Sequence, residues 1–263
     1  ETTEEFIKKE VLPDLDKMEQ HDFDLVVAKL RRCADLGLFL VDVPEDFGGL
    51  ELDKVTSMLL AEKIAPAGSF SITYGGQTGI GLLPLVYYGT AEQKQRYLNK
   101  LTSGEWIGAY ALTEPNSGSD ALGAKTTAAL TPDGRHYVLN GVKQFITNAG
   151  TRMSKLIVVL ARTGDRPDGK PELSMLLVPT DTRGVAIGGP YAKMGWRCSD
   201  TRPVQFDEVR IPSRNLVGVR GAGLKQMLQI LVEHKVVRID RNLDDVLANL
   251  VHPEFAEEAL VAR

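Results

Sequence analysis

The sequence predicts an α+β protein with an N-terminal all-α domain, then an antiparallel β-barrel domain, then the start of a C-terminal helical domain. Three observations predict this order. Apolar residues recur every three or four positions up to Gly108, alternate from Ile107 to Leu216, and return to helical spacing in GLKQMLQILVEHK from Gly223. The expected domains are residues 1–108, 109–217 and 218–263.

The N-terminal part is expected to form helices connected by short loops. The predicted helical segments are residues 2–18, 24–39, 54–69, 79–89 and 90–104. The fourth is apolar nearly all round, which is typical of a buried helix. In the fifth, Thr90 is followed three residues later by Gln93, which is the spacing of a capping box.

The middle part contains short strands separated by turn signals. Residues 125–147 form a hairpin pattern around TPDG, at 131–134, with a second turn expected at LNG, 139–141. Residues 156–180 form another pair, joined by the loop from Gly164 to Pro171. Residues 185–189 and 202–212 add at least two strands, and this spacing favours a compact antiparallel barrel or sandwich.

Composition is that of an ordinary soluble globular protein: 263 residues, 43% hydrophobic, 25% charged and a formal net charge of −4. This charge gives no reason to expect nucleic acid or an anionic membrane as partner. No apolar run approaches the roughly 20 residues that span a bilayer. Cys33 and Cys198 make no disulfide framework, and reduced cysteines suit a bacterial cytoplasm or a mitochondrial matrix. The four histidines lack metal-ligand spacing, so no metal site is expected.

An unusual set of polar residues and glycines lies in YALTEPNSGSD, residues 110–120, where helix gives way to strand. Pro115 stops regular pairing, and Gly118 permits either an unusual backbone conformation or the close approach of a ligand. Ser117 and Ser119 lie where turn N–H groups are often free. The segment is either a structural Asx-type turn or a site for an anionic or heteroaromatic ligand.

A second polar cluster, KQFITNAG at 143–150, follows about 30 residues later. Phe145 and Ile146 precede Thr147, so an aromatic ring adjoins hydroxyl and amide groups that can stack on and hydrogen-bond a flat ring system. The same pattern also fits a strand that runs into a glycine turn. If the two clusters lie on adjacent strands, they converge on one face of the barrel.

Several motifs in sequence order resemble those of the acyl-CoA dehydrogenase family: YALTEPNSGSD, NGVKQFITNAG, AKMGWRCSDT and FDEVRIPSRNLVG. The preceding LGLFLVDVPEDFGGLELD fits as well, and the resemblance covers roughly residues 1–231. It implies FAD bound between the barrel and a C-terminal helical domain. The flavin-binding residues that it implies are Tyr110, Leu112, Thr113, Gly118, Ser119, Phe145, Ile146 and Thr147, with Ser119 also reaching the acyl-CoA substrate.

The implied reaction is α,β-dehydrogenation of an acyl-CoA thioester in fatty acid β-oxidation, with electrons passed to an electron-transfer flavoprotein. The resemblance also implies a homo-oligomer, either a tetramer or a dimer. Two alternatives remain: an acyl-CoA oxidase-type flavoenzyme, and a catalytically incomplete module for binding or assembly. Glycines of the segment 75–81 fit either an acyl tunnel or close helix packing.

The family's catalytic glutamate has no clear counterpart here. Glu233, on the first helix after the barrel, is the only candidate, and it lies one residue before the position that some members use; an exposed helical carboxylate is the alternative. From about Val232 onward the sequence no longer follows the family, so the C-terminal helical domain is largely missing from the pattern. A flavin held by the barrel alone is expected to bind weakly.

Overall fold

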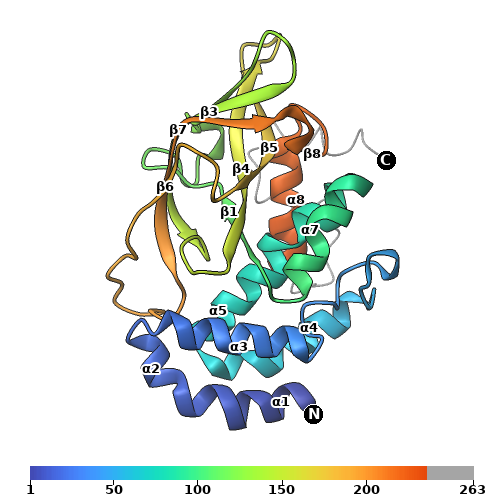
Figure 1. The fold of residues 1–263 in the computed structure, drawn as a ribbon, viewed down its shortest axis with the longest axis vertical. Coiled ribbons are helices and arrows are strands. Elements are labelled where there is room, and N and C mark those ends of the chain that lie inside the picture. Colours follow the sequence, from blue (N-terminus) through green and yellow to red (C-terminus); the bar gives the residue numbers. More distant parts are fainter. Residues whose placement is uncertain (236–263) are drawn as a thin grey trace.

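The computed structural model describes the backbone of residues 1–235 and the side chains of residues 1–231. The N-terminal helices lie at the bottom of Figure 1 and the sheet lies above them. Helical elements are α1 Thr2–Phe6, π-helix Ile7–Val11, 3-10 turn Leu12–Asp14, α2 Leu15–Glu19, α3 Phe23–Asp35, 3-10 turn Glu45–Phe47, α4 Lys54–Ile64, 3-10 turn Ala65–Ala67, α5 Ser69–Gly75, π-helix Gly76–Gly81, α6 Leu83–Tyr88, α7 Ala91–Thr102, 3-10 turns Ala121–Gly123 and Ser213–Asn215, and α8 Gly223–Lys235. Strands are β1 Ile107–Ala111, β2 Thr127–Leu130, β3 His136–Thr147, β4 Ser154–Asp165, β5 Pro171–Pro179, β6 Val185–Ile187, β7 Thr201–Pro212 and β8 Leu216–Val217.

Local sequence signals explain where the helices begin. The Asp22 side chain accepts a hydrogen bond from Leu25 N at 3.0 Å and caps α3. The predicted capping box of α7 is confirmed, because Thr90 and Gln93 each accept from the other's backbone N–H. The Gln93 amide also donates to the carbonyls of Arg214 and Leu216, so the start of α7 is tied to the sheet domain.

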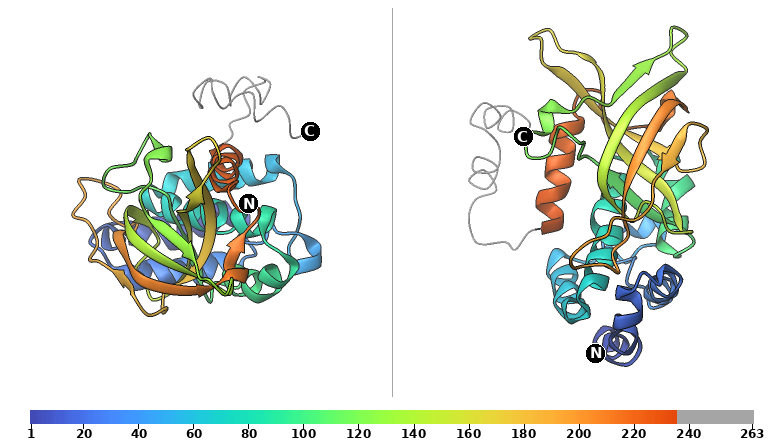
Figure 2. Two further views of the ribbon diagram at one scale, coloured as in Figure 1. Left: turned by 90° about the horizontal axis from the view of Figure 1, so that it is seen from above. Right: turned by 90° about the vertical axis from the view of Figure 1, so that its left-hand side faces the viewer.

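The strands form one eight-stranded sheet in the order β6-β7-β3-β2-β4-β5-β8, with β1 added alongside β4. The pairing of β1 with β4 is parallel, as is a single residue pair between β2 and β4, and the other pairings are antiparallel. Figure 2 shows the sheet curling round, with α8 running alongside it. The predicted fold class is confirmed, as are the hairpins β2–β3 and β4–β5.

The second turn predicted at residues 139–141 is wrong, because β3 continues straight through it. Leu139 pairs with Val209 and Gly141 with Phe206, so an extra residue is accommodated in β7 rather than by a turn in β3. A glycine is needed at position 141 for another reason: Thr126 packs directly against the backbone there, and a Cβ on residue 141 would lie 2.5 Å from Thr126 Oγ1.

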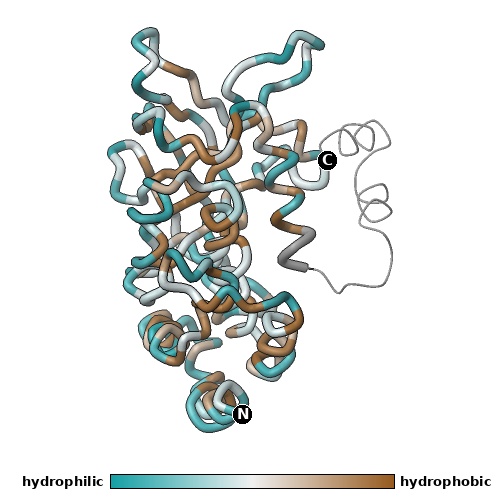
Figure 3. Tube along the Cα trace, turned by 90° about the vertical axis from the view of Figure 1, so that its right-hand side faces the viewer, coloured by the Kyte–Doolittle hydropathy of each residue, from teal (hydrophilic) through white to brown (hydrophobic). Residues whose placement is uncertain are grey.

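Two hydrophobic cores lie on opposite faces of the sheet, and β4 contributes to both. Leu156, Val158 and Leu160 pack with the helices and α8, whereas Ile157 and Val159 pack inside the curled sheet. A strand that is buried on both faces reads as a continuous apolar run, here LIVVLA. Figure 3 shows that hydrophobic segments of the backbone gather in the interior, whereas the loops at the outside are mostly hydrophilic.

The helical part meets the sheet through two glycines that touch. A Cβ on Gly108 in β1 would lie 2.7 Å from the carbonyl oxygen of Gly81, and one on Gly81 would lie 3.0 Å from that of Gly108. A Cβ on Gly76 would lie 2.9 Å from the amide nitrogen of Asn148. Gly76 and Gly81 therefore allow close packing. Of the two interpretations of the glycines in 75–81, an acyl tunnel or close helix packing, these two positions fit the second.

Gly108→Ala should destabilise the fold by about 1–3 kcal/mol, because the new methyl group forces apart two backbones in contact. Urea unfolding followed by circular dichroism measures the effect. Gly189→Ala is the matched control, since a Cβ there has nothing within 4 Å. Equal stability of the two variants would contradict the close contact.

Candidate functional site

The two polar clusters found in the sequence lie side by side. Thr113, just after β1, accepts a hydrogen bond from Gln144 N of β3 at 2.8 Å. The neighbouring Leu112 carbonyl accepts from Lys143 Nζ at 3.0 Å. The two segments therefore meet as expected, but not on adjacent strands: β1 pairs with β4, and the contact to β3 is made by the residues that follow β1.

A buried ion pair between Lys143 and Glu114 joins the two segments on the side that faces the protein interior. Lys143 Nζ lies 2.7 Å from Glu114 Oε1, and the side chains are 0% and 6% exposed. The Glu114 carboxylate also accepts from the backbone N–H groups of Lys125, at 2.7 Å, and Thr126, at 3.1 Å. A buried charge is tolerated only with such partners: the Lys143 ammonium has two, Glu114 and the Leu112 carbonyl, and the Glu114 carboxylate has three, Lys143 and the two N–H groups.

The surroundings of this pair shift both pKa values. Burial raises the pKa of the Glu114 carboxyl, but the Lys143 ammonium and the hydrogen bonds from Lys143, Thr126 and Lys125 outweigh it and leave the pKa below its ordinary value of 4.5. Burial lowers the pKa of Lys143 below its ordinary value of 10.5, against the opposing attraction of Glu114. The carboxylate is thus held in its charged form by its donors.

A β-bulge directly follows Lys143. Lys143 pairs with Val204 and Ile146 with Arg202, so β3 contains one extra residue at this point. Phe145 has φ of 60°, which is rare for a bulky side chain, and 57% of it is exposed. Its ring centroid lies 5.1 Å from that of Tyr191. The bulge thus turns an aromatic ring outward at the edge of the site.

The two threonines of the clusters are available for a ligand. Thr113 and Thr147 are half-buried, and no residue in the described part of the chain hydrogen-bonds either hydroxyl. Leu112 is also half-buried, while Gly118 and Ser119 are exposed. With the exposed Phe145, these accessible residues of the two joined segments define the candidate edge, which carries the hydroxyl groups of Thr113 and Thr147.

Two of the predicted residues face away from this edge. Tyr110 is 6% exposed and donates its hydroxyl to the Met227 carbonyl of α8 at 3.1 Å. Ile146 is 2% exposed and packs in the core inside the sheet. Any contact of these two residues with a ligand at this edge would come from their backbone atoms.

The turn that follows Glu114 corrects two expectations. Ser117 has no free N–H, because it donates to the Glu114 carbonyl at 3.2 Å, and its hydroxyl donates to the Asp120 carbonyl at 2.6 Å. Gly118 does not have a positive φ, and a Cβ there would meet nothing within 4 Å. Of the two interpretations of Gly118, the unusual backbone is wrong, and close approach by a ligand remains.

Lys143 and Glu114 are the residues that the sequence interpretation missed. The signal was present: Tyr137, Leu139, Gly141 and Lys143 occupy alternate positions of one strand, and Tyr137 and Leu139 are buried. Strand periodicity therefore places Lys143 on the inward side, where a lysine needs a buried acidic partner.

Within the part of the chain that the structure describes, the other predicted features form no second site. The catalytic candidate Glu233 lies in the last turn of α8, and its side chain is outside the described residues. Among the residues that the structure describes, no three His, Cys, Asp or Glu side chains are grouped to hold a metal ion. The helices in this same part of the chain lack the length and apolar character that crossing a membrane requires.

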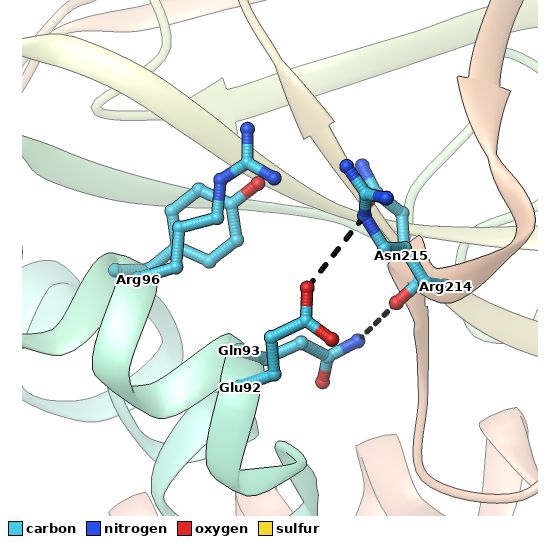
Figure 4. A pocket seen from close by; sticks show the side chains of 6 residues that line it. Glu92, Gln93, Arg96, Arg214 and Asn215 are labelled. Carbon is cyan, nitrogen blue, oxygen red and sulfur yellow. Dashed lines mark hydrogen bonds and ion pairs between the residues drawn. The ribbon is translucent and has the colours of Figure 1, made fainter.

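A small polar hollow lies elsewhere, between α7 and the turn Ser213–Asn215 (Figure 4). Glu92 and Arg214 face each other across it at 3.8 Å. The hollow is lined by residues that already bind one another, and none of the predicted site residues lines it.

The lowered pKa of Glu114 predicts a pH dependence. A carboxyl group with a lower pKa in the folded state stabilises the protein above about pH 4.5, and this contribution is lost as the pH falls below that value. Replacing the pair by Glu114→Gln with Lys143→Met should make the free energy of unfolding fall less steeply below this pH. The slope reports the protons taken up on unfolding, and this number should be smaller in the variant by at most one. Urea unfolding at a series of pH values measures the slope, and equal slopes for wild type and variant would count against the buried carboxylate.

Comparison with known proteins agrees with the motifs. Residues 1–105 match the acyl-CoA dehydrogenase N-terminal domain, and residues 109–209 match the acyl-CoA dehydrogenase middle domain. A probable acyl-CoA dehydrogenase of Bacillus subtilis is 48% identical over 223 residues, which are 84% of this chain and 36% of that relative.

Solved structures agree as well. An acyl-CoA dehydrogenase complexed with FAD from Bacillus anthracis superposes with a TM-score of 0.82 at 49% identity, covering 88% of this chain and 39% of that one. A chain in a structure of the electron transferring flavoprotein of Acidaminococcus fermentans gives a TM-score of 0.79 at 31% identity, covering 88% of this chain and 60% of that one. The chain thus spans between about a third and three fifths of the length of these relatives. On these matches, and on the two domains they cover, the chain belongs to the acyl-CoA dehydrogenase family.

Proposed function

We propose that this chain binds FAD at the edge formed by Thr113, Phe145 and Thr147, and that it forms part of an enzyme that dehydrogenates acyl-CoA thioesters. The observation that carries the proposal is the pair of threonine hydroxyls without partners in the described part of the chain, on two segments fastened together beside an exposed aromatic ring. Family membership supports the choice of cofactor, because a relative with 49% identity is described as complexed with FAD.

The residues at this edge fit a flavin. A flat, polar-edged ring system requires hydrogen-bond donors along its edge and an apolar surface against one face, and the two threonines and Phe145 supply these. The bound flavin would accept the hydride that leaves the β-carbon of the substrate. The open surroundings of Gly118 leave room for a ligand to approach the backbone there.

The chain's own residues would then have separate tasks. Thr113 and Thr147 would orient the ring edge, and Phe145 would exclude water from one ring face. Ser119 would reach the acyl-CoA. Removal of the α-proton needs a base, and Glu233 stays the candidate for that role. We further propose that residues 1–108, 109–217 and 218–263 are the N-terminal helical domain, the β-barrel domain and the start of the C-terminal helical domain.

Family membership also suggests an electron acceptor and an oligomeric state for this chain. We propose an electron-transfer flavoprotein as acceptor, supported by the similarity to a chain from an electron transferring flavoprotein structure. A homotetramer or homodimer is proposed on family membership alone. The oxidase-type enzyme and the non-catalytic module remain the alternatives, and the following experiment separates them.

Anaerobic addition of acyl-CoA to the FAD-loaded protein should bleach the visible flavin absorbance, because hydride transfer reduces the ring. Short-chain and long-chain acyl-CoA are tested in parallel, since the described residues do not select chain length. Rapid peroxide formation after air is admitted would indicate the oxidase-type enzyme. Retained CoA binding without bleaching would indicate the non-catalytic module and overturn the proposed activity.

Gly118→Ala should weaken FAD binding several-fold while leaving the free energy of unfolding unchanged or slightly higher, because the new methyl group meets nothing in the protein itself. Flavin fluorescence titration and urea unfolding measure the two effects. Gly189→Ala, also in open space, is the control and should change neither. Unaltered FAD affinity of Gly118→Ala would place the flavin away from this turn.

A further inference from the structure

We propose that Lys143 is a positioning residue for the flavin: by holding the Leu112 carbonyl, it directs the Thr113 N–H outward to bind the cofactor. This inference rests on the proposed function, because it names how the same edge is built. Neither the family comparisons nor the motifs assign this task to Lys143.

The first step is the geometry of one peptide unit. The Leu112 carbonyl and the Thr113 N–H belong to the same planar trans peptide, so they point in opposite directions. Because the carbonyl points to the buried Lys143 ammonium at 3.0 Å, the N–H points away from it. No residue in the part of the chain that the structure describes accepts from that N–H.

The second step concerns the charge of the donor. A hydrogen bond from an ammonium group to a carbonyl polarises the peptide and makes its N–H a stronger donor. The ammonium itself cannot move to solvent, since the Lys143 side chain is 0% exposed and Glu114 holds it at 2.7 Å. An apolar side chain would supply neither the polarisation nor the fixed direction, and a neutral donor would polarise the peptide less.

The third step connects the second segment. Lys143 is the last regularly paired residue of β3 before the bulge, and the next residue, Gln144, donates to the Thr113 carbonyl at 2.8 Å. The anchored Lys143 thus lies directly before the bulge, and the bulge turns Phe145 outward. One side chain thus fixes the relative position of both segments that would face the flavin.

Stability alone is a poor explanation for this pair. Replacement of a buried ion pair by apolar residues of similar size is often neutral or stabilising, because burying two charges costs hydration energy. The core inside the sheet lies close by and is lined by apolar side chains such as Ile146 and Val204. The pair is better explained by the direction it gives to the Leu112–Thr113 peptide.

The test replaces the pair by a neutral one of similar shape, Lys143→Met with Glu114→Gln, so that no unpaired charge is left buried. The control is Asn215→Leu, which removes another buried donor to a backbone carbonyl, that of Leu177 at 2.8 Å. Three properties are measured: the FAD dissociation constant, the midpoint potential of bound FAD, and the amide proton shift of Thr113 in the flavin-free protein.

In the double variant we expect the dissociation constant to rise by about tenfold or more, as for loss of a charge-assisted hydrogen bond. The midpoint potential should become more negative, and the Thr113 proton should shift upfield in the flavin-free protein. Glu114→Gln alone keeps the ammonium on the Leu112 carbonyl, so it should bind FAD more tightly than the double variant. Asn215→Leu should leave all three properties close to those of the wild type.

Wild-type FAD affinity and potential in the double variant would overturn this inference and leave the proposed function intact. So would an equal loss in Glu114→Gln or in Asn215→Leu, because the effect would then be a general loosening of the barrel. Failure of the wild-type protein to bind FAD at all would instead overturn the proposed function, and the flavin role of Lys143 with it.

Discussion

The buried ion pair between Lys143 and Glu114 is the constraint on which the candidate site depends. Two charges that are almost wholly removed from water are tolerated only when each is bound by several partners. Those partners are the Leu112 carbonyl for the lysine and the N–H groups of Lys125 and Thr126 for the glutamate. The pair therefore joins three backbone segments at one place. The side of the Leu112–Thr113 peptide that faces away from the pair is the side to which we assign the flavin in our proposal.

The bulge in β3 lies directly beside this ion pair. Strict alternation from Tyr137 and Leu139 through Lys143 would turn Phe145 inward, against the core, and Ile146 outward. The extra residue reverses this: Ile146 packs inside the sheet and Phe145 is exposed, with the strained φ of 60° as its cost. A strained backbone at this point, next to two hydroxyls without partners in the described part of the chain, is typical of a site built for a ligand.

Sequence periodicity was sufficient for the features that are set locally. The capping box of α7 and the hairpin at TPDG need only neighbouring residues, and both were predicted. The turn expected at residues 139–141 was wrong because Gly141 is required by its close contact with Thr126, which lies just before β2 and is distant in the sequence. The role of Lys143 was missed for a similar reason, since its partner Glu114 lies 29 residues away in the sequence. The motifs indicate the candidate site, whereas the contacts that orient its residues are non-local.

The helical domain also takes part in this orientation. Asn148, the residue after Thr147, donates its side-chain amide to the Thr73 carbonyl of α5 at 3.0 Å and its backbone N–H to the Asp200 carbonyl at 2.8 Å. Its own carbonyl accepts from Ser154 Oγ of β4 at 2.6 Å. Thr147 thus lies between the Lys143 anchor on one side and an asparagine fixed by three other segments on the other. Because both ends of this short segment are held within the chain itself, the backbone at Thr147 is already in place without a ligand, which would reduce the ordering cost of binding one.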